Sequence, residues 1–441
     1  MSALAFYFAK GGYIISGYDR SETRITQMLK EAGCNVTHED ETNNLPDLFR
    51  DKNSVLVVFT PAIPAENRIL SFFRSNRFNV YKRSEILGEI SKHTDTLAVA
   101  GTHGKTTVST MIAHLLKQSD VDCSAFLGGI SKNYNSNLLL GESRYTVIEA
   151  DEFDRSFHRL EPLMAVITSL DADHLDIYGD QENMIKAYNE FCKKIRKGGT
   201  LIVNNRIRKS ISVPEGVNCY TYGMEGKADY SVSEIRLKQD YYVFNILTPA
   251  YLIEKMRFPF PGKINIENLT AAIAIAQLCG VSECEIRKAA MLFRGVQRRF
   301  DIRFNEHGVT YIDDYAHHPE EIRAFITSVR EYFSGRKISG IFQPHLYSRT
   351  RDHAEGFASI LDELDETILL PVYPAREKPI EGITSAIILD KMRSERKRLM
   401  KKEDIPGKLD ISSLDVLLTI GAGDIDTLVK PIEERLRKER T

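Results

Sequence analysis

The sequence predicts an α/β protein with mainly parallel sheets, and three observations support this fold class. Short apolar runs alternate with stretches of helical period along the whole chain, as they do where strands and helices alternate in parallel sheets. The apolar runs end in acidic, polar or glycine residues, which is typical of sheets whose functional groups gather at the carboxyl ends of the strands. The length of 441 residues allows about two to four domains with well-buried cores.

The strand-like runs fall into three segments, and we expect each segment to form its own sheet. These segments cover 1–95, 96–296 and 297–441. The basic run RSERKRLMKKED (393–404) is interpreted as the solvated face of a helix. The predicted strands lie at 13–19 and 54–64 in the first segment, at 96–100, 145–151 and 163–171 in the second, and at 309–319, 337–345, 366–373 and 415–424 in the third.

The composition is that of an ordinary soluble globular protein, with 27% charged residues, 42% hydrophobic residues and a net charge of −2. No basic region indicates nucleic-acid binding. The six cysteines include no C-x-x-C pair, and we interpret them as reduced, buried thiols. No positive region precedes the apolar start MSALAFYFAK, and no run approaches the roughly 18 apolar residues of a membrane helix. The sequence therefore predicts a cytoplasmic protein without a membrane or nucleic-acid partner.

A glycine-rich loop follows the predicted strand at 96–100 and leads into a helix. Its G-K-T ending is that of a phosphate-binding loop, although Val99 stands where the usual spacing has a glycine. The apolar residues of the helix recur with helical spacing, so the helix N-terminus and the loop N–H groups form an anion site together. A glycine turn capped by threonines is the alternative interpretation. The predicted phosphate-binding residues are Gly101, Thr102, His103, Gly104, Lys105, Thr106 and Thr107.

Acidic residues follow the next two predicted strands. Mg²⁺ that is bound with a nucleotide takes one or two protein oxygens, and phosphate and water supply the others. Each acid taken singly fits a helix cap or a solvated loop, and the histidine fits a structural role, but three strand ends that converge on a phosphate loop favour a metal–nucleotide site. These residues are Glu149, Asp151, Glu152 and Asp154 at or just past the end of the first strand, and Asp171, Asp173 and His174 at or just past the end of the second.

Seven motifs along the chain, in this order, resemble those of the Mur ligases of peptidoglycan synthesis. They are GTHGKTT, EADEFD, DADHLDIYGD, RRFD, DDYAHHP, FQPHLYSRT and TIGAGDIDTL. The resemblance spans nearly the whole chain, and the family's own phosphate loop has the shortened form seen here. The resemblance implies a UDP-sugar-binding domain (1–95), a central ATP-binding domain (96–296) and a C-terminal amino-acid-binding domain (297–441).

The resemblance also implies a reaction. ATP phosphorylates the carboxylate of UDP-N-acetylmuramate, the amino group of L-alanine attacks the acyl phosphate, and phosphate leaves from a tetrahedral intermediate. Such a site mainly positions its reactants and neutralises charge. ATP and Mg²⁺ are the expected cofactors, UDP-N-acetylmuramate and L-alanine are the expected partners, and we expect a monomer or a weak homodimer.

Site residues carry over from the family to matching positions. Lys105 would hold the β/γ phosphates, Thr106 one Mg²⁺, and Glu149 with His174 the second metal and the acyl-phosphate region. The family usually has histidine where this chain has Ile264, a departure that affects part of the adenine contact. The remaining expected contacts are Asn268 for adenine, Arg299 in preference to Arg298 for the γ-phosphate, Asp314 for the ribose, and Tyr315, His317, His345 and Arg349 for the muramoyl carboxylate and alanine.

Two further features bear on the subfamily. Sister ligases that add later residues carry a carbamoylated lysine near the position of Asn189, and its absence favours the alanine-adding members. The alternatives are a recycling ligase that adds a whole tripeptide to UDP-N-acetylmuramate and a truncated, non-catalytic nucleotide-binding protein. Gly421 and Gly423 form a G-x-G that we interpret as a strand-to-helix turn.

The start of the chain departs from the family pattern. Family members begin with a strand and a glycine-rich loop of the type GIGGIG before a helix that starts MSALA, and this sequence starts at that helix. We expect the missing strand to be central in the N-terminal sheet and the missing loop to contact the UDP pyrophosphate. The natural chain would then be longer by roughly a strand and a loop. Asp19 and Thr60 are the remaining candidates for UDP-sugar contacts.

Overall fold

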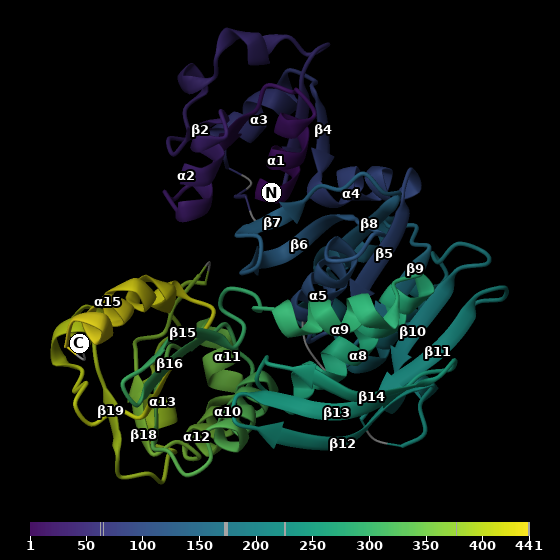
Figure 1. Ribbon diagram of the computed structural model, residues 1–441. Helices are drawn as coiled ribbons and strands as arrows, with labels where there is room; N and C mark the ends of the chain where they lie inside the picture. Colours follow the sequence, from purple (N-terminus) through teal and green to yellow (C-terminus); the bar gives the residue numbers. More distant parts are fainter. Residues whose placement is uncertain (62, 65, 172–174, 225, 376, 440–441) are drawn as a thin grey trace. The chain divides into compact units, whose positions relative to one another are not determined.

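The computed structural model describes residues 1–61, 63–64, 66–171, 175–224, 226–375 and 377–439 (Figure 1). The chain folds into two compact units. The predicted α/β class with mainly parallel sheets is confirmed, and the domain boundaries at 95 and 296 stay a prediction. The first unit consists of Met1–Arg236, Val243–Phe258 and Glu267–Phe293, and the second of Leu237–Tyr242, Pro259–Ile266 and Arg294–Thr441.

The helices and strands alternate along most of the chain. The strands are β1 (Ser16–Tyr18), β2 (Asn35–Thr37), β3 (Leu56–Phe59), β4 (Asn79–Lys82), β5 (Asp95–Ala100), β6 (Ser124–Ser131), β7 (Ser136–Leu139), β8 (Tyr145–Glu149), β9 (Met164–Ile167), β10 (Thr200–Asn204), β11 (Asn218–Gly223), β12 (Tyr230–Lys238), β13 (Tyr241–Leu247), β14 (Leu252–Phe258), β15 (Asp301–Glu306), β16 (Val309–Asp314), β17 (Ile338–Phe342), β18 (Glu366–Leu369), β19 (Lys397–Leu399) and β20 (Val416–Ile420). The helices are α1 (Ser2–Lys10), α2 (Arg24–Glu31), α3 (Arg68–Ser75), α4 (Arg83–Lys92), α5 (Lys105–Lys117), α6 (Leu175–Tyr178), α7 (Gln181–Cys192), α8 (Lys263–Leu278), α9 (Glu283–Leu292), α10 (Pro319–Tyr332), α11 (Tyr347–Asp352), α12 (Ala354–Leu361), α13 (Ala386–Leu389), α14 (Ile405–Lys408) and α15 (Val429–Glu439).

The first unit starts with two separate pairs of parallel strands. β1 pairs with β2, and β3 pairs with β4, which confirms the predicted strands at 13–19 and 54–64. The two pairs are separate sheets, so the expectation of one sheet for 1–95 is wrong. Tyr13 and Ile14, just before β1, are 65% and 71% exposed. α1 contributes Ala3 and Leu4 to the hydrophobic core of the neighbouring large sheet. The expectation of a further strand upstream stays a prediction.

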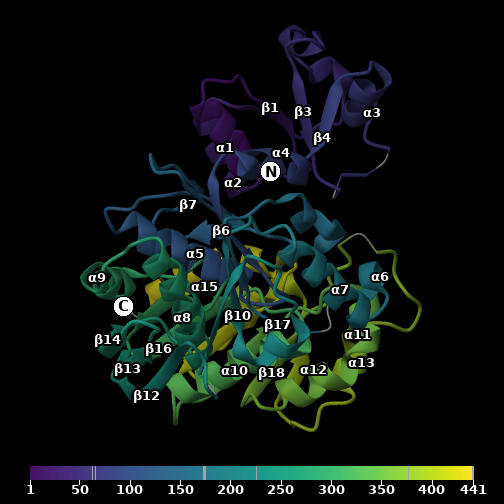
Figure 2. The same ribbon diagram turned by 90° about the vertical axis from the view of Figure 1, so that its right-hand side faces the viewer.

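The large sheet of the first unit has ten strands in the order β14-β13-β12-β11-β10-β9-β5-β8-β6-β7. β5 runs parallel to both β8 and β9, so the carboxyl ends of these three strands meet at one edge. The predicted apolar stripe of α5 is fully buried. α5 packs on β6 and β8, and α9 packs on α5 and β14 (Figure 2). The stripe consists of Val108, Met111, Ile112, Leu115 and Leu116.

The second unit contains a six-stranded sheet in the order β15-β16-β20-β17-β18-β19. β15 is antiparallel to β16, and the remaining pairs are parallel. The four strands predicted in this part are confirmed as β16, β17, β18 and β20.

The basic run 393–404 is not the predicted helix face, because its centre forms the edge strand β19. A row of lysine and arginine side chains suits an edge strand, since the charges discourage pairing with a further strand. The charge pattern is therefore explained by the sheet edge and not by a helix.

The structure offers no membrane-spanning segment: across the described part of the chain, every helix is too short or too polar to cross a bilayer. All six cysteines are free thiols, and Cys34, Cys123, Cys192 and Cys279 are buried. The prediction of buried thiols is wrong for Cys219, which is half-buried, and for Cys284, which is exposed.

Candidate active site

The phosphate loop connects the end of β5 to the start of α5, and two of its positions require glycine. Gly101 has φ = 137°, and a Cβ there would overlap the Thr168 hydroxyl. Gly104 has φ = 81° and immediately precedes the first helical residue, Lys105. These backbone conformations are accessible to glycine without strain. The loop N–H groups therefore lie at the N-terminus of a buried helix, as an anion site requires.

The two residues after β9 fix the shape of this loop. Thr102 N donates to Ser169 O (3.2 Å), and His103 N donates to Ser169 Oγ (2.8 Å). The Thr168 hydroxyl donates to His103 O (2.5 Å). Thr168 and Ser169 are not among the predicted site residues, and the available signal was a Thr-Ser pair at the carboxyl end of a strand adjacent to β5.

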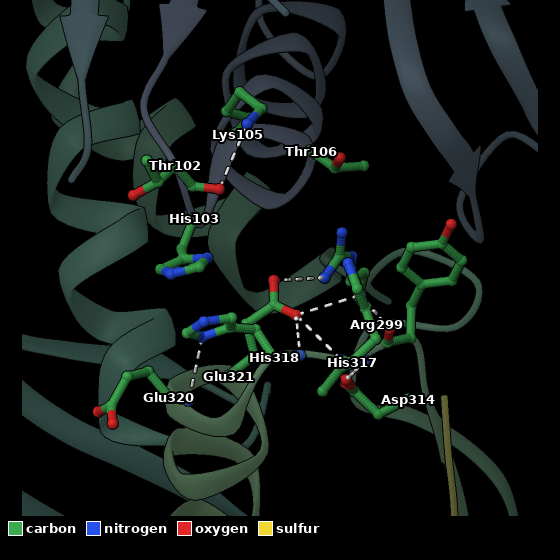
Figure 3. Close-up of polar contacts among 12 residues, drawn as sticks. Thr102, His103, Lys105, Thr106, Arg299, Asp314, His317, His318, Glu320 and Glu321 are labelled. Carbon is green, nitrogen blue, oxygen red and sulfur yellow. Dashed lines mark hydrogen bonds and ion pairs between the residues drawn. The ribbon is translucent and has the colours of Figure 1, made fainter. Parts of the chain in front are cut away.

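Lys105 has a buried partner that sequence analysis did not assign to it. Its ammonium donates to Glu152 Oε1 at 2.8 Å and lies 2.7 Å from Oε2. It also donates to the carbonyls of Gly101 (2.6 Å) and Thr102 (3.3 Å), the latter drawn in Figure 3. Burial alone would lower the pKa of Lys105, but the charge and hydrogen bond of Glu152 outweigh burial and raise it. Lys105 is therefore a cation at neutral pH.

Thr106 and Glu149 lie together, as expected from the converging strand ends. Thr106 Oγ1 donates to Glu149 Oε1 (2.9 Å), and Gly128 N donates to Glu149 Oε2 (2.9 Å). Ser109 Oγ makes a longer bond to the same carboxylate (3.4 Å). A hydroxyl and a carboxylate are ligands that suit Mg²⁺. Within the described residues, no group of three or more His, Cys, Asp or Glu side chains could hold a metal ion without other ligands.

The second acidic motif is only partly visible. Asp173 and His174 lie outside the described residues, so the expected role of His174 stays a prediction. Asp171 N donates to Thr102 Oγ1 (3.0 Å), which ties this motif to the loop. The Asp171 carboxylate lies 3.7 Å from His103 Nε2.

The proposed adenine residue Asn268 lies on α8 beside the phosphate loop. A Cβ on Gly104 would come within 3.1 Å of Asn268 Oδ1, so the amide lies directly against the loop backbone. Asn268 is buried, and the preceding Glu267 forms an ion pair with Arg206 (2.5 Å). Ile264, the residue that departs from the family pattern, is 38% exposed.

The other first-unit candidates have local hydrogen bonds that explain their positions. Asp19 accepts from Ser21 N (3.1 Å) just after β1, and Thr60 follows β3. Asn189 on α7 donates to Ser210 O (3.1 Å) and accepts from Ser212 N (2.7 Å), so it connects α7 to the segment after β10. The roles of Asp19 and Thr60 toward a substrate stay predictions.

In the second unit, Asp314 is a buried carboxylate at the end of β16. Its oxygens accept from Phe300 N (2.7 Å) and Ala316 N (2.8 Å). Burial raises the pKa of Asp314 to about 6, although Arg299 and the two N–H groups favour the charged form. Asp314 is therefore held by the backbone, and it is ionised at neutral pH.

The two adjacent arginines have different surroundings. Arg298 bonds Asp313 (3.2 Å) and Gly421 O (2.5 Å), contacts that hold β16 and β20 together. Arg299 Nη1 is 3.9 Å from Glu321 (Figure 3). Both guanidinium groups lie over the Tyr315 ring, at 5.1 and 5.2 Å from its centroid. The fold thus uses Arg298 internally, and the preference for Arg299 as the γ-phosphate contact stays a prediction.

The histidines of the second unit are close to each other. His317 Nδ1 lies 3.0 Å from Tyr315 O and 3.3 Å from Glu321, both acceptors, so Nδ1 carries the proton and Nε2 is the basic nitrogen. Burial lowers the pKa of His317. The His317 and His345 rings are 6.0 Å apart, and His345 stacks on Tyr373.

His345 is neutral at physiological pH. Burial, followed by the charges of His317 and Arg349, lowers the pKa of His345 to about 4. Arg349 lies on α11, two residues after Tyr347, where that helix begins. His317 and His345 therefore lie close together, and the charge of Arg349 lowers the pKa of both; their role toward the substrates stays a prediction.

The G-x-G is confirmed as a strand-to-helix turn between β20 and the 3₁₀ helix Asp424–Leu428. Gly421 has φ = 146°, and a Cβ would come within 2.8 Å of Gln343 O. A Cβ on Gly423 would contact Gln343 Oε1 (2.5 Å) and Tyr373 Cβ (2.7 Å). Both glycines allow close packing on Gln343, and Gly423 also packs against the Tyr373 side chain that stacks on His345.

Parallel sheets, a glycine-dependent phosphate loop and a hydroxyl–carboxylate pair beside it define a nucleotide-dependent enzyme of the phosphate-loop class. The chain belongs to the Mur ligase family. The matching family descriptions are "Mur ligase family, catalytic domain" over residues 1–94, "Mur ligase middle domain" over 99–276 and "Mur ligase, glutamate ligase domain" over 298–423.

Individual relatives match over nearly their full length. Two proteins named UDP-N-acetylmuramate--L-alanine ligase are those of Parabacteroides distasonis, 48% identical over 440 residues (100% of this chain and 95% of the relative), and Phocaeicola vulgatus, 46% identical over 441 residues (100% and 96%). The crystal structure of the UDP-N-acetylmuramate-alanine ligase of Thermotoga maritima superposes with a TM-score of 0.85 at 26% identity (99% and 96%). A murein peptide ligase of Psychrobacter arcticus shares the fold, with a TM-score of 0.71 at 19% identity (99% and 96%).

Proposed function

We propose that this protein joins L-alanine to the carboxylate of UDP-N-acetylmuramate at the expense of ATP, in the synthesis of peptidoglycan precursors. The observation that carries this function is full-length identity of 42–48% to ligases of that name, together with the phosphate loop described above. A ligation driven by ATP needs a site that binds phosphate and a site that binds the reacting carboxylate and amine. The chain supplies residues suited to each.

The phosphate loop would activate the carboxylate. A carboxylate is a poor electrophile, and transfer of the γ-phosphoryl group converts it to an acyl phosphate with a good leaving group. The reaction needs positioning and charge neutralisation more than acid–base chemistry. The loop N–H groups and the Lys105 ammonium fit that task, because both present positive charge from the start of α5.

Mg²⁺ fits beside the loop. Thr106 and Glu149 would hold it, since their oxygens already lie 2.9 Å apart, and His174 is proposed to take part from the neighbouring motif. The ion, when bound, would neutralise charge on the phosphates. The same Glu149 carboxylate is anchored by Gly128 N, so its position does not depend on the metal alone.

Residues of the second unit would bind the reacting ends of the substrates. Asp314 would take the ribose hydroxyls, and Arg299 the γ-phosphate. Neutral His317 and His345 would line the site for the muramoyl carboxylate and alanine, because a neutral imidazole accepts a proton from an incoming ammonium where an imidazolium does not. Arg349 would bind a carboxylate with its guanidinium fork.

The setting of the reaction follows from the substrates. We propose that the protein acts in the cytoplasm as a monomer or weak homodimer, without a nucleic-acid or membrane partner. The net charge of −2 and the six free cysteines support this setting.

Phosphate release tests the function directly. Inorganic phosphate should form from ATP and Mg²⁺ only when UDP-N-acetylmuramate and L-alanine are both present. Turnover with a tripeptide but not with free alanine would reassign the protein to the recycling activity. Absence of turnover with either acceptor, in protein that binds ATP, would identify a non-catalytic nucleotide-binding protein.

A further inference from the structure

The donors of the Lys105 side chain are all in use. Its ammonium carries three N–H groups, and they donate to the carbonyls of Gly101 and Thr102 and to Glu152 Oε1, while Glu152 Oε2 lies 2.7 Å from Nζ in the same ion pair. A phosphate oxygen that binds Lys105 must therefore replace one of these contacts. If the phosphate oxygen replaces a Glu152 oxygen, the ion pair with Lys105 is lost; if it replaces a loop carbonyl, the ion pair remains.

Glu152 is the acceptor that is hardest to replace. The residue is 0% exposed, and its carbonyl accepts from both Tyr178 Oη (2.6 Å) and Arg155 N (3.0 Å), so its backbone is fixed. A buried carboxylate that loses its cation is strongly destabilising. The bond from Lys105 to the Thr102 carbonyl, at 3.3 Å, is the longest of the four contacts and belongs to the loop itself.

We infer that Glu152 is a positioning residue for the phosphate-binding lysine: it keeps its ion pair with Lys105 when nucleotide binds, and a phosphate oxygen replaces the Thr102 carbonyl. The inference rests on the proposed ATP-dependent function. Glu152 acts through Lys105 and does not contact substrate. It offsets part of the lysine charge and holds Nζ at a fixed place between the loop and the end of β8.

The Glu152→Gln variant tests this role because it keeps the shape of the side chain and removes its charge. Lys105 would then be a buried cation without its nearest counter-charge, so the thermal midpoint should fall. Nucleotide phosphates supply the missing negative charge, so MgADP should raise the midpoint further in the variant than in the wild type. The dissociation constant of MgADP should fall several-fold, and kcat should drop by about tenfold or more because Nζ is no longer held in place.

Two control variants separate positioning from general stability. Glu433→Gln breaks the Arg303–Glu433 ion pair (2.7 Å) in the second unit and should lower the midpoint without changing the MgADP-induced shift. Glu152→Asp restores the charge and should return the MgADP-induced shift toward the wild-type value. A merely structural Glu152 would make Glu152→Gln behave like Glu433→Gln.

The outcomes are distinguishable. A wild-type protein that MgADP does not stabilise would count against the ATP-dependent function. The positioning role alone is overturned if MgADP raises the thermal midpoint of Glu152→Gln by no more than it raises that of the wild type. An unchanged kcat in Glu152→Gln overturns it as well. If Glu152→Gln does not fold, the double variant Lys105→Met/Glu152→Gln is used, because it removes both charges. It should unfold cooperatively, with a thermal midpoint above that of Lys105→Met. A double variant no more stable than Lys105→Met overturns the inference.

Discussion

Thr106 and Glu149 are joined by a hydrogen bond from Thr106 Oγ1 to Glu149 Oε1 (2.9 Å), which links the first turn of α5 to the end of β8. The second carboxylate oxygen accepts from the backbone of Gly128 in β6 (2.9 Å). Three elements therefore define the place of one carboxylate, and this place is where the proposed magnesium site needs it. Changes on β6 should consequently affect catalysis without altering any ligand.

Gly128→Ala should lower ligation by about tenfold or more, because a Cβ there would overlap the Glu149 carboxylate and displace it from Thr106. The KM for Mg²⁺ should rise in the same variant, and it is measured by phosphate release at varied Mg²⁺ concentration. Gly407→Ala is the matched control, since nothing lies within 4 Å of a Cβ at that position. An unchanged requirement for Mg²⁺ in Gly128→Ala would contradict the placement of Glu149.

Lys105→Ala should reduce ligation by at least about 100-fold, the order of magnitude for removing one preorganised charge donor. Secondary structure should persist, checked by circular dichroism. Lys117→Ala is the control on the same helix: Lys117 is at the other end of α5 and bonds Leu140 O (3.0 Å). Equal losses in the two variants would show a general effect on α5 and not a specific contact with phosphate.

Much of this site could be predicted because it depends on local pattern. The strand ends, the glycine loop and the buried stripe of α5 each follow from residues near one another in sequence. The position of Glu149 beside Thr106 follows from the strand order β9-β5-β8, which parallel α/β topology favours.

The residues that were not predicted depend on side-chain direction and geometry, which the spacing of apolar residues in the sequence does not indicate. Three acids follow β8 within five positions, and only the turn into the 3₁₀ helix Phe153–Arg159 turns Glu152 toward Lys105. The support from Thr168 and Ser169 depends on the side-chain geometry of a neighbouring strand end. For the run that forms β19, local charge suggested a helix, and pairing with β18 decided otherwise.

Asp314→Asn should change how stability depends on pH. Burial raises the folded-state pKa of Asp314 from 3.8 to about 6, so the folded state binds the proton more tightly than the unfolded state does. Ionising this carboxyl in the folded state lowers the free energy of unfolding. The loss is absent below about pH 4 and complete above about pH 6. At 1.36 kcal/mol per pKa unit it amounts to about 3 kcal/mol. Asparagine does not titrate, so the variant should gain stability relative to the wild type as pH rises from 4 to 6.

Thermal midpoints of the wild type and Asp314→Asn between pH 4 and 7 check this expectation. Asparagine offers one acceptor fewer to the backbone N–H groups, which lowers the thermal midpoint of the variant by an amount that does not depend on pH. The change with pH of the difference between the two midpoints is therefore the informative quantity. Asp390→Asn changes an exposed carboxyl and serves as the control. A difference between wild type and Asp314→Asn that is constant over this range would contradict the raised pKa.

Arg349→Lys should raise the KM for L-alanine or for UDP-N-acetylmuramate by about tenfold, because lysine keeps the charge but cannot form the two parallel bonds of a guanidinium with a carboxylate. Arg351→Lys is a matched control on the same helix, since Arg351 is exposed and bonds Asp352 (2.7 Å). Steady-state kinetics with each substrate varied in turn identify which carboxylate Arg349 binds. If Arg349 only stabilised α11, Arg349→Lys would lower the thermal midpoint and leave both KM values unchanged.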